Sequence, residues 1–453
     1  MYSKKWMTTA ILLIALLVTS MPVMAHGNDG DLGRETLPPN DGWAAFGNRT
    51  TGGSLADSSQ VYVVTNRAEL IAALNNGVPS STSPSNPSNE PKIIYVDGTI
   101  DMNVDDENQP LTCEDYYRDG YTLEAFLATY DPAVWGRVAP TGPLETARLA
   151  SRDAQQARVR IRIGSNTTIV GIDKHATIRG GWFDLRGSSS VNRTNIIIRN
   201  LTFEDTYDCF PQWSPTDGEL GSWNALYDSI SLRNTDHVWI DHNTFVDRDT
   251  ADDTLPQYFG VIYQVHDGLL DITNASDFVT VSWNRFANHD KVMLIGSSDS
   301  ASADRGKLNV TLHHNLFEDV GQRVPRVRFG KVHVYNNYYK IDNPDNYVYS
   351  WGVGIESAIY AQNNFFRVKK HTDITPDRFI SVLKGTAIHE SGTQLNAPSN
   401  SGHHMVDVLA AYNAVHDPDL LSDVGWTPSL FVDLMEARDV FHVVESHAGP
   451  FNW

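Results

Sequence analysis

The 453-residue chain has only two cysteines, Cys113 and Cys209. A dense disulfide framework is therefore excluded. A structural zinc site is not indicated either, because Zn²⁺ takes three or four Cys or His ligands in closely spaced pairs. The two cysteines are compatible with one disulfide and equally with two free thiols.

Basic residues are also scarce, with 35 Lys and Arg against 55 Asp and Glu and a formal net charge of −20. The chain has no excess of positive charge with which to neutralise phosphates, so we expect no nucleic-acid partner. An acidic protein can bind an acidic polymer only where a metal ion or a local basic cluster reverses the field.

No hydrophobic run reaches the roughly 20 residues that a membrane-spanning helix needs. The apolar run at residues 10–18 follows Lys4 and Lys5, and it precedes Val23-Met24-Ala25. This order is typical of a cleaved signal peptide. We therefore predict a signal peptide over residues 1–25, a secreted, extracellular protein and no membrane partner. Residues 26–453 are expected to form a single domain.

Two helices are predicted before the strand-rich part of the chain. The first begins after Asn66, which forms a capping box with Glu69, and it ends at Gly77. The second covers residues 144–157, where apolar side chains fall near one face.

One pattern recurs after residue 160: a short run with aliphatic residues, then an Asn and, two positions after it, an aromatic residue. It occurs in VWIDHNTF (238–245), VTVSWNRF (279–286), VTLHHNLF (310–317), VHVYNNYY (332–339) and IYAQNNFF (359–366). The repeated residues are Asn243, Asn284, Asn315, Asn337 and Asn364, which are 41, 31, 22 and 27 positions apart. The segment IIIRNLTF (196–203) fits with Leu201 in place of Asn.

A minimum spacing near 22 with variable insertions is expected for a coil of parallel strands, in which each turn adds one strand to every sheet. We predict an all-β, right-handed parallel β-helix with short capping helices and long loops. Its core would cover about residues 160–370, with residues 371–453 packed on the outside. Stacked Asn and aromatic side chains would form internal ladders. A β-sandwich would instead show strand spacings of 8–12 residues with hairpin turns.

Several stretches carry a more specific likeness, namely YDSISL (227–232), HDGLLDITNASDFVTVSWNRF (266–286), NHDKVMLIGSSDS (288–300) and RVPRVRFG (323–330). Together they resemble secreted bacterial pectate lyases of the parallel β-helix type. The resemblance implies a polysaccharide lyase that degrades plant cell-wall pectin. Its substrate would be polygalacturonate, a (1→4)-α-D-galacturonan, and we expect a monomer.

By this resemblance, Asp228, Asp267 and Asp271 match the family's calcium ligands, and Ca²⁺ is the expected cofactor. Asp217 is a weaker candidate for an additional ion that binds with substrate. In a fully extended strand Asp267 and Asp271 would stand about 13 Å apart, too far to share one ion. Either the chain bends at Gly268 or two ions are present.

Lys291, Arg323 and Arg328 supply the opposite charge. Arg323 and Arg328 would lie on opposite faces of an uninterrupted strand, but Pro325 interrupts it. The resemblance implies that Lys291 and Arg328 bind the uronate carboxylate, while Arg323 is the base of a calcium-assisted β-elimination. Because free arginine has a pKa of about 12.5 or higher, we expect an alkaline optimum. Arg326 is expected to be structural or to face solvent.

Three other functions are weighed against this one. A pectin lyase acting on methyl-esterified pectin would not need the three aspartates, and a β-helical polygalacturonase would carry a Gly-His-Gly motif, which is absent. A non-catalytic polysaccharide-binding β-helix would not need the three cations. The strand-associated histidines, His242, His266, His289, His313 and His314, are interpreted as hydrogen-bonded structural residues.

Overall fold

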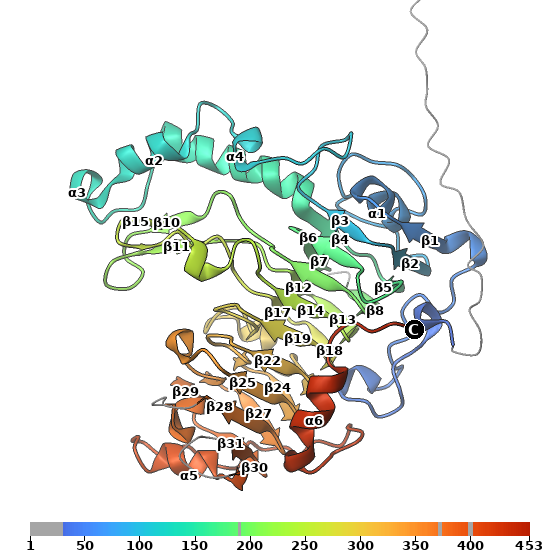
Figure 1. Ribbon diagram of the computed structural model, residues 1–453, viewed down its shortest axis with the longest axis vertical. Coiled ribbons are helices and arrows are strands. Elements are labelled where there is room, and N and C mark those ends of the chain that lie inside the picture. Colours follow the sequence, from blue (N-terminus) through green and yellow to red (C-terminus); the bar gives the residue numbers. More distant parts are fainter. Residues whose placement is uncertain (1–29, 189–191, 370–373, 397–401) are drawn as a thin grey trace, which may run out of the picture.

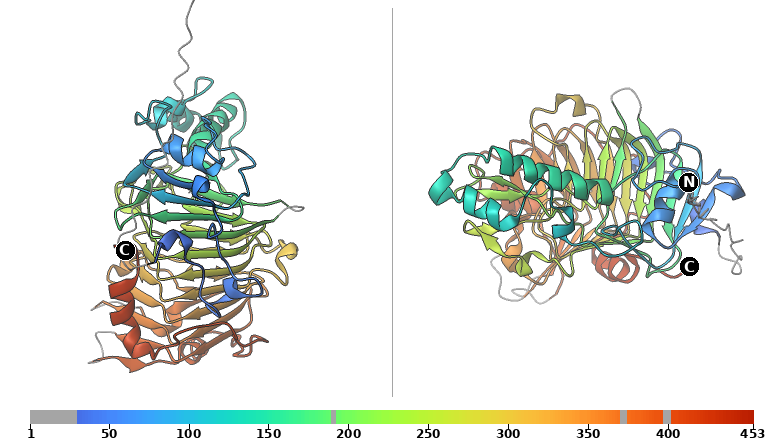
Figure 2. Two further views of the ribbon diagram at one scale, coloured as in Figure 1. Left: turned by 90° about the vertical axis from the view of Figure 1, so that its right-hand side faces the viewer. Right: turned by 90° about the horizontal axis from the view of Figure 1, so that it is seen from above.

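The structure, a computed structural model, describes residues 30–188, 192–369, 374–396 and 402–453. The strands form three large sheets of ten, ten and eight strands. Within each sheet the strands stack along the long axis of the molecule, as Figures 1 and 2 show. The chain visits the sheets in rotation, and successive visits pair in parallel. The predicted parallel β-helix is confirmed. The predicted signal peptide, residues 1–25, lies outside the described residues.

The sheets are named I, II and III in the order in which the chain enters them. Sheet I contains β1 (Val61–Val64), β2 (Lys92–Val96), β5 (Thr167–Gly171), β8 (Arg193–Arg199), β13 (Thr235–Asp241), β18 (Asp277–Ser282), β21 (Val310–His313), β24 (Lys331–Tyr335), β27 (Ala358–Gln362) and β30 (Ile388–Ser391). Sheet II contains β3 (Thr99–Asp101), β6 (Thr177–Arg179), β9 (Thr202–Glu204), β14 (Thr244–Val246), β19 (Arg285–Ala287), β22 (Leu316–Glu318), β25 (Tyr338–Ile341), β28 (Phe365–Val368), β31 (Gln394–Asn396) and the antiparallel β32 (His404–Met405). Sheet III contains β4 (Arg160–Arg162), β7 (Trp182–Arg186), β12 (Ile230–Arg233), β17 (Leu270–Thr273), β20 (Leu294–Ile295), β23 (Arg326–Val327), β26 (Trp351–Gly354) and β29 (Ile380–Leu383).

The coil is longer than residues 160–370 at both ends. Strands β1 to β3 precede this range and β29 to β31 follow it, in register with their neighbours. These strands lack the Asn-aromatic repeat, so the pattern alone did not reveal them. Part of residues 371–453 does pack outside, where Val440 and Val444 of α6 (Ala437–His447) contact Tyr338 and Phe365.

The repeated asparagines form the expected ladder inside the coil. The side-chain Nδ2 of each donates to Oδ1 of the next from Asn243 through Asn364, over 3.0 to 3.2 Å. At the start of the ladder, Leu201 contributes only its backbone N–H, which donates to Asn243. The aromatic residues two positions later stack in parallel from Phe203 to Phe366, and Phe379 continues the stack.

The helices lie at the ends and sides of the coil. Both predicted helices are confirmed, as α1 (Arg67–Leu74), which Asn66 caps, and α4 (Pro143–Val159). Leu70, Ile71 and Leu74 of α1 join the main core. The remaining helices are α2 (Leu123–Tyr130), α3 (Pro132–Trp135) and α5 (Val408–Asn413). None of the helices described is both long and apolar enough to cross a membrane.

Three long excursions leave the coil at one corner, between a strand of sheet II and the next strand of sheet III. They run from β3 to β4, from β9 to β12 and from β14 to β17. The second forms a hairpin of β10 (Gln212–Ser214) and β11 (Ser222–Asn224), and the third a hairpin of β15 (Gln257–Tyr258) and β16 (Val261–Ile262). Figure 1 shows these hairpins and helices α2 to α4 on the same side of the coil. They therefore wall the corner at which the strands of sheet III begin.

Candidate active site

The six residues predicted for the site lie in or beside four adjacent strands of sheet III, in the order β12, β17, β20 and β23. Asp228 precedes β12, Asp271 lies in β17, and Arg328 follows β23 directly. Lys291 precedes β20 and forms a β-bridge to Gln322, next to Arg323. The coil thus brings residues that are 100 positions apart in the sequence, Asp228 and Arg328, to one face.

Asp228 is a buried carboxylate, and Asp271, on the next turn, is half-buried. Oδ1 of Asp228 accepts a hydrogen bond from the Gly268 N–H over 3.0 Å, and Oδ2 accepts one from the Ser231 hydroxyl. Oδ1 of Asp271 accepts a hydrogen bond from the Leu294 N–H over 2.9 Å. Each carboxylate is therefore held by a backbone N–H of the next turn.

The chain bends at Leu269, between Asp267 and Asp271, which is the first of the two predicted alternatives. The side chain of Asp267 is 34% exposed, and its Oδ1 lies 3.9 Å from Nζ of Lys291. Its backbone carbonyl lies 3.0 Å from Nε2 of His289. The Asp267 carboxylate thus lies beside Lys291, the predicted substrate-binding lysine.

The three acids repel one another. Burial, together with repulsion from Asp271 and Asp267, raises the pKa of Asp228 well above its usual range. Burial and repulsion from Asp267 raise the pKa of Asp271 to about 7. A cation bound here would relieve this repulsion.

The three predicted calcium ligands carry the carboxylate oxygens that calcium prefers, but their side chains are not grouped around one point. Within residues 30–188, 192–369, 374–396 and 402–453, no three His, Cys, Asp or Glu side chains are grouped closely enough to hold a metal ion. Two of the three predicted ligands nevertheless converge, because a Cβ added at Gly268 would lie 3.0 Å from Oδ1 of Asp228 and 2.7 Å from Oδ1 of Asp271. Carboxylate oxygens are the donors that Ca²⁺ prefers. Asp228 and Asp271 would hold the ion, with Asp267 as a third ligand on turning from Lys291.

Arg323 occupies a turn rather than a strand. Its φ of 61° is left-handed, and Val324 and Pro325 form a turn before β23 begins at Arg326, so Pro325 interrupts the strand as predicted. The buried Nε of Arg323 has no hydrogen-bond partner among the described residues. Lys291 and Arg323 line the same cavity, of about 520 Å³.

Arg328 is held more firmly than Arg323. Its Nε donates to Oδ1 of Asp299 over 2.7 Å, and its Nη1 donates to the Gly296 carbonyl over 2.9 Å. Lys384 binds the other oxygen of Asp299. No hydrogen bond joins Nη2 of Arg328 to the described residues, and Arg328 does not line the cavity that Lys291 and Arg323 share.

The walls of the cavity were not predicted, apart from Asp217. They come from the two hairpins and from the turns before β20 and β23, and their residues include Trp223, Asn224, Gln257, Ile262, Gln264, Asp290 and Gln322. Nδ2 of Asn224 lies 3.4 Å from Oδ2 of Asp217. The two tryptophans of the first hairpin, Trp213 and Trp223, are an apolar signal in an otherwise polar loop and could have marked it as a folded wall.

The strand-associated histidines are hydrogen-bonded, as expected. His266 contacts the Thr206 and Thr250 carbonyls over 2.7 Å each, and Nδ1 of His313 lies 2.8 Å from Nδ1 of the next imidazole along the chain. Burial alone would lower the pKa of His289, but Asp247, 2.6 Å away, outweighs it and raises that pKa to about 9. None of these three lies among the residues that line the cavity with Lys291 and Arg323.

Known proteins are similar to this chain in both sequence and fold. Residues 139–395 match the family described as Pectate lyase. The chain is 44% identical over 447 residues to a pectate lyase of Bacillus subtilis (strain 168), which covers 98% of this chain and 99% of that protein. It is 36% identical over 411 residues to Pectate lyase E of Dickeya dadantii (strain 3937), which covers 89% of this chain and 87% of that protein.

Solved structures agree. A thermostable pectate lyase matches with a TM-score of 0.88 at 48% identity, over 94% of this chain and 100% of that one. A pectate lyase bound to a hexasaccharide matches with a TM-score of 0.84 at 44% identity, over 93% of this chain and 100% of that one. Since the match extends along nearly the whole chain in both sequence and fold, this protein belongs to the pectate lyase family of polysaccharide lyases.

Proposed function

We propose that the protein cleaves polygalacturonate by calcium-assisted β-elimination, with Arg323 as the base. The observation that carries this proposal is the shared cavity of Lys291 and Arg323, in which Nζ of Lys291 lies 3.9 Å from Oδ1 of Asp267, a predicted calcium ligand. Asp228 and Asp271 converge on the neighbouring turns, which supports a metal ion beside these cations. An acidic protein can bind an acidic polymer there because the local field is reversed.

Lys291 binds and orients the carboxylate of the uronate at the cleavage site, and Nη2 of Arg328 provides a second cationic contact. Ca²⁺, when bound, supplies further positive charge at that carboxylate. The neutral guanidine of Arg323 then accepts the C5 proton. The electron pair forms the C4=C5 double bond, the C4–O bond breaks, and the departing oxygen takes a proton from water.

The alternatives fit the site less well. A pectin lyase acting on methyl-esterified pectin has no use for two mutually repelling carboxylates. A non-catalytic binding module would not need Arg323, whose unpartnered Nε is buried beside the cavity. Secretion follows from the N-terminal pattern of residues 1–25, and an extracellular enzyme of this specificity would degrade plant cell-wall pectin as a monomer.

The test is a direct assay of the purified protein on polygalacturonate and on highly esterified pectin, with and without chelator. We expect ultraviolet absorbance from unsaturated product on polygalacturonate, its loss with chelator, and activity that rises toward alkaline pH. Loss of a general base lowers the rate by about 10²- to 10⁴-fold, which is the expected effect of Arg323→Lys. Arg326→Lys, at the start of β23 directly after the turn that contains Arg323, is the matched control. Reducing ends without absorbance, or near-normal activity of Arg323→Lys, would refute the proposal.

A further inference from the structure

The wall of the cavity that carries Asp217 is supported from behind by a helical insert, residues 113–159. This insert contains helices α2 to α4 and lies over the β10–β11 hairpin, as Figures 1 and 2 show. The two share a separate hydrophobic core, to which the insert contributes Phe126 and Tyr130 and the hairpin contributes Trp213 and Trp223. The wall is therefore a folded unit rather than a loose loop.

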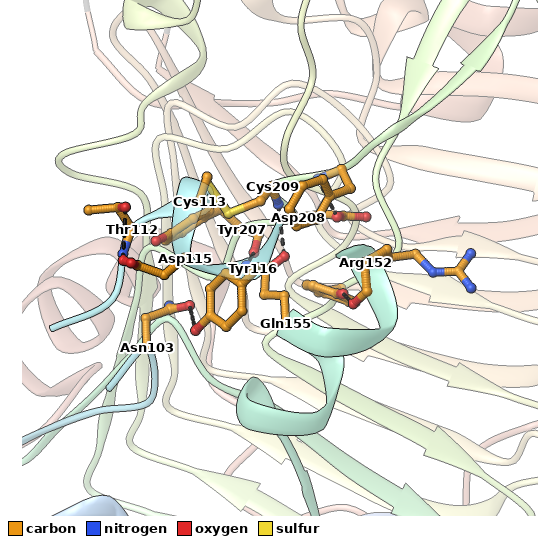
Figure 3. Close-up of a disulfide and its surroundings, with 12 residues drawn as sticks. Asn103, Thr112, Cys113, Asp115, Tyr116, Arg152, Gln155, Tyr207, Asp208 and Cys209 are labelled. Carbon is orange, nitrogen blue, oxygen red and sulfur yellow. Dashed lines mark hydrogen bonds between the residues drawn. A yellow bond between two sulfur atoms is a disulfide. The ribbon is translucent and has the colours of Figure 1, made fainter. Parts of the chain in front are cut away.

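The insert is fixed to the base of the hairpin by a buried clamp. A disulfide joins Cys113 to Cys209, so the two cysteines do pair. Gln155 of α4 accepts a hydrogen bond from the Cys209 N–H over 2.9 Å and donates one to the Tyr207 carbonyl over 3.1 Å (Figure 3). Arg148 donates to the Phe210 carbonyl over 2.5 Å. The insert thus cannot shift against residues 207–210 without breaking these contacts.

Arg137, between α3 and α4, links this fixed insert to the loop at the tip of the hairpin. Its Nε donates to the Pro215 carbonyl over 3.0 Å, Nη1 to the Glu219 carbonyl over 2.5 Å and Nη2 to the Gly218 carbonyl over 3.0 Å. Three carbonyls of residues 215–219 are therefore gathered by one planar guanidinium, whose fork of donors a lysine cannot reproduce.

The gathered loop surrounds a residue of the cavity. Asp217 lies between Pro215 and Gly218 and lines the cavity with Lys291 and Arg323. Gly218 has a left-handed φ of 75°, so the chain turns sharply after Asp217. Arg137 itself is exposed and does not line the cavity. Its effect on the site can only pass through the loop.

We propose that Arg137 is a positioning residue for substrate binding, which holds loop 215–219 and with it Asp217 in place against the bound polysaccharide. The proposal rests on the proposed function, in which this cavity binds polygalacturonate. Arg137 touches no reacting atom in that scheme, so its removal weakens binding and leaves the chemical step intact.

The experiment compares Arg137→Gln, Arg137→Lys and the control Arg118→Gln in steady-state kinetics on polygalacturonate. Arg118 is also exposed and also donates to backbone carbonyls, but those of Asp115 and Tyr117 within the insert. Loss of a hydrogen-bonded clamp of this kind corresponds to a rise in KM of about fivefold for Arg137→Gln. We expect kcat to stay within twofold, Arg137→Lys to recover part of the KM, and Arg118→Gln to match the unmutated protein.

Hydrogen exchange provides a readout that does not depend on activity. Amides of residues 215–224 should exchange faster in Arg137→Gln than in Arg118→Gln. Equal exchange in the two variants, an unchanged KM, or a fall in kcat without a change in KM would overturn the proposal. If the unmutated protein binds polygalacturonate without cleaving it, the proposed activity fails, while the dissociation constants of the same variants still decide the role of Arg137.

Discussion

Asp228 and Asp271, on successive turns of the coil, direct their Oδ1 atoms toward the same point beside Gly268. A Cβ at that point would lie 3.0 Å from the first oxygen and 2.7 Å from the second. A methyl group on residue 268 would therefore crowd both carboxylate oxygens.

Gly268→Ala should weaken calcium binding by at least about tenfold, because the new methyl group occupies the space between the two carboxylates. Calorimetric titration with calcium measures this directly. Gly30→Ala is the control, since its Cβ would meet nothing within 4 Å. Unchanged calcium affinity in Gly268→Ala would place the ion elsewhere.

Asp271→Asn should make the calcium-free protein more stable and abolish its response to calcium. The substitution removes a charge that Asp228 and Asp267 repel, so the unfolding free energy should rise by about 1–4 kcal/mol without calcium. Thermal melts with calcium and with chelator test this. The exposed Asp253→Asn serves as the control. A lower melting temperature for Asp271→Asn in chelator would contradict the repulsion between these acids.

His333 should make the fold sensitive to acid. Burial lowers the pKa of His333 to about 3, whereas in the unfolded chain it titrates near 6.5. Its contribution to stability is therefore complete above about pH 6.5 and is lost as the pH falls toward 3. Melts from pH 7 to pH 4 in calcium should show a smaller loss of stability for His333→Gln than for the control His175→Gln, which changes an exposed histidine. Parallel curves would remove His333 from this role.

Asn315→Ala should interrupt the ladder in the middle of the coil. Oδ1 of Asn315 accepts hydrogen bonds from both N–H and Nδ2 of Asn284, and its Nδ2 donates to Val281 and Asn337. Their loss leaves buried polar groups unpaired, at a cost of about 2–4 kcal/mol in unfolding free energy. Urea unfolding measures this against the exposed control Asn346→Ala. A difference below 1 kcal/mol would mean that water or neighbouring groups replace the ladder.

Much of the architecture could be predicted from local patterns. The Asn-aromatic repeat marked five consecutive turns, because identical side chains stack only when turns are in register. The start of α1 was visible because Asn66 caps its own helix, whereas α1 ends at Leu74, before the predicted stop at Gly77. The outer turns were missed, since residues such as those of β1 and β2 pack as ordinary aliphatic strands and carry no repeated polar signature.

The chain on its own specified which chemistry was available, namely three aspartates, three cations and two cysteines in recognisable segments. Tertiary structure decided how they meet. Three long excursions leave between sheets II and III and wall one corner, and the stacking of β12 on β17 brings Asp228 and Asp271 to the same point. The pairing of Cys113 with Cys209 and the reach of Arg137 to loop 215–219 depend on how the excursions pack against each other across some 80 to 100 residues. Such contacts depend on through-space distance, which no local periodicity records.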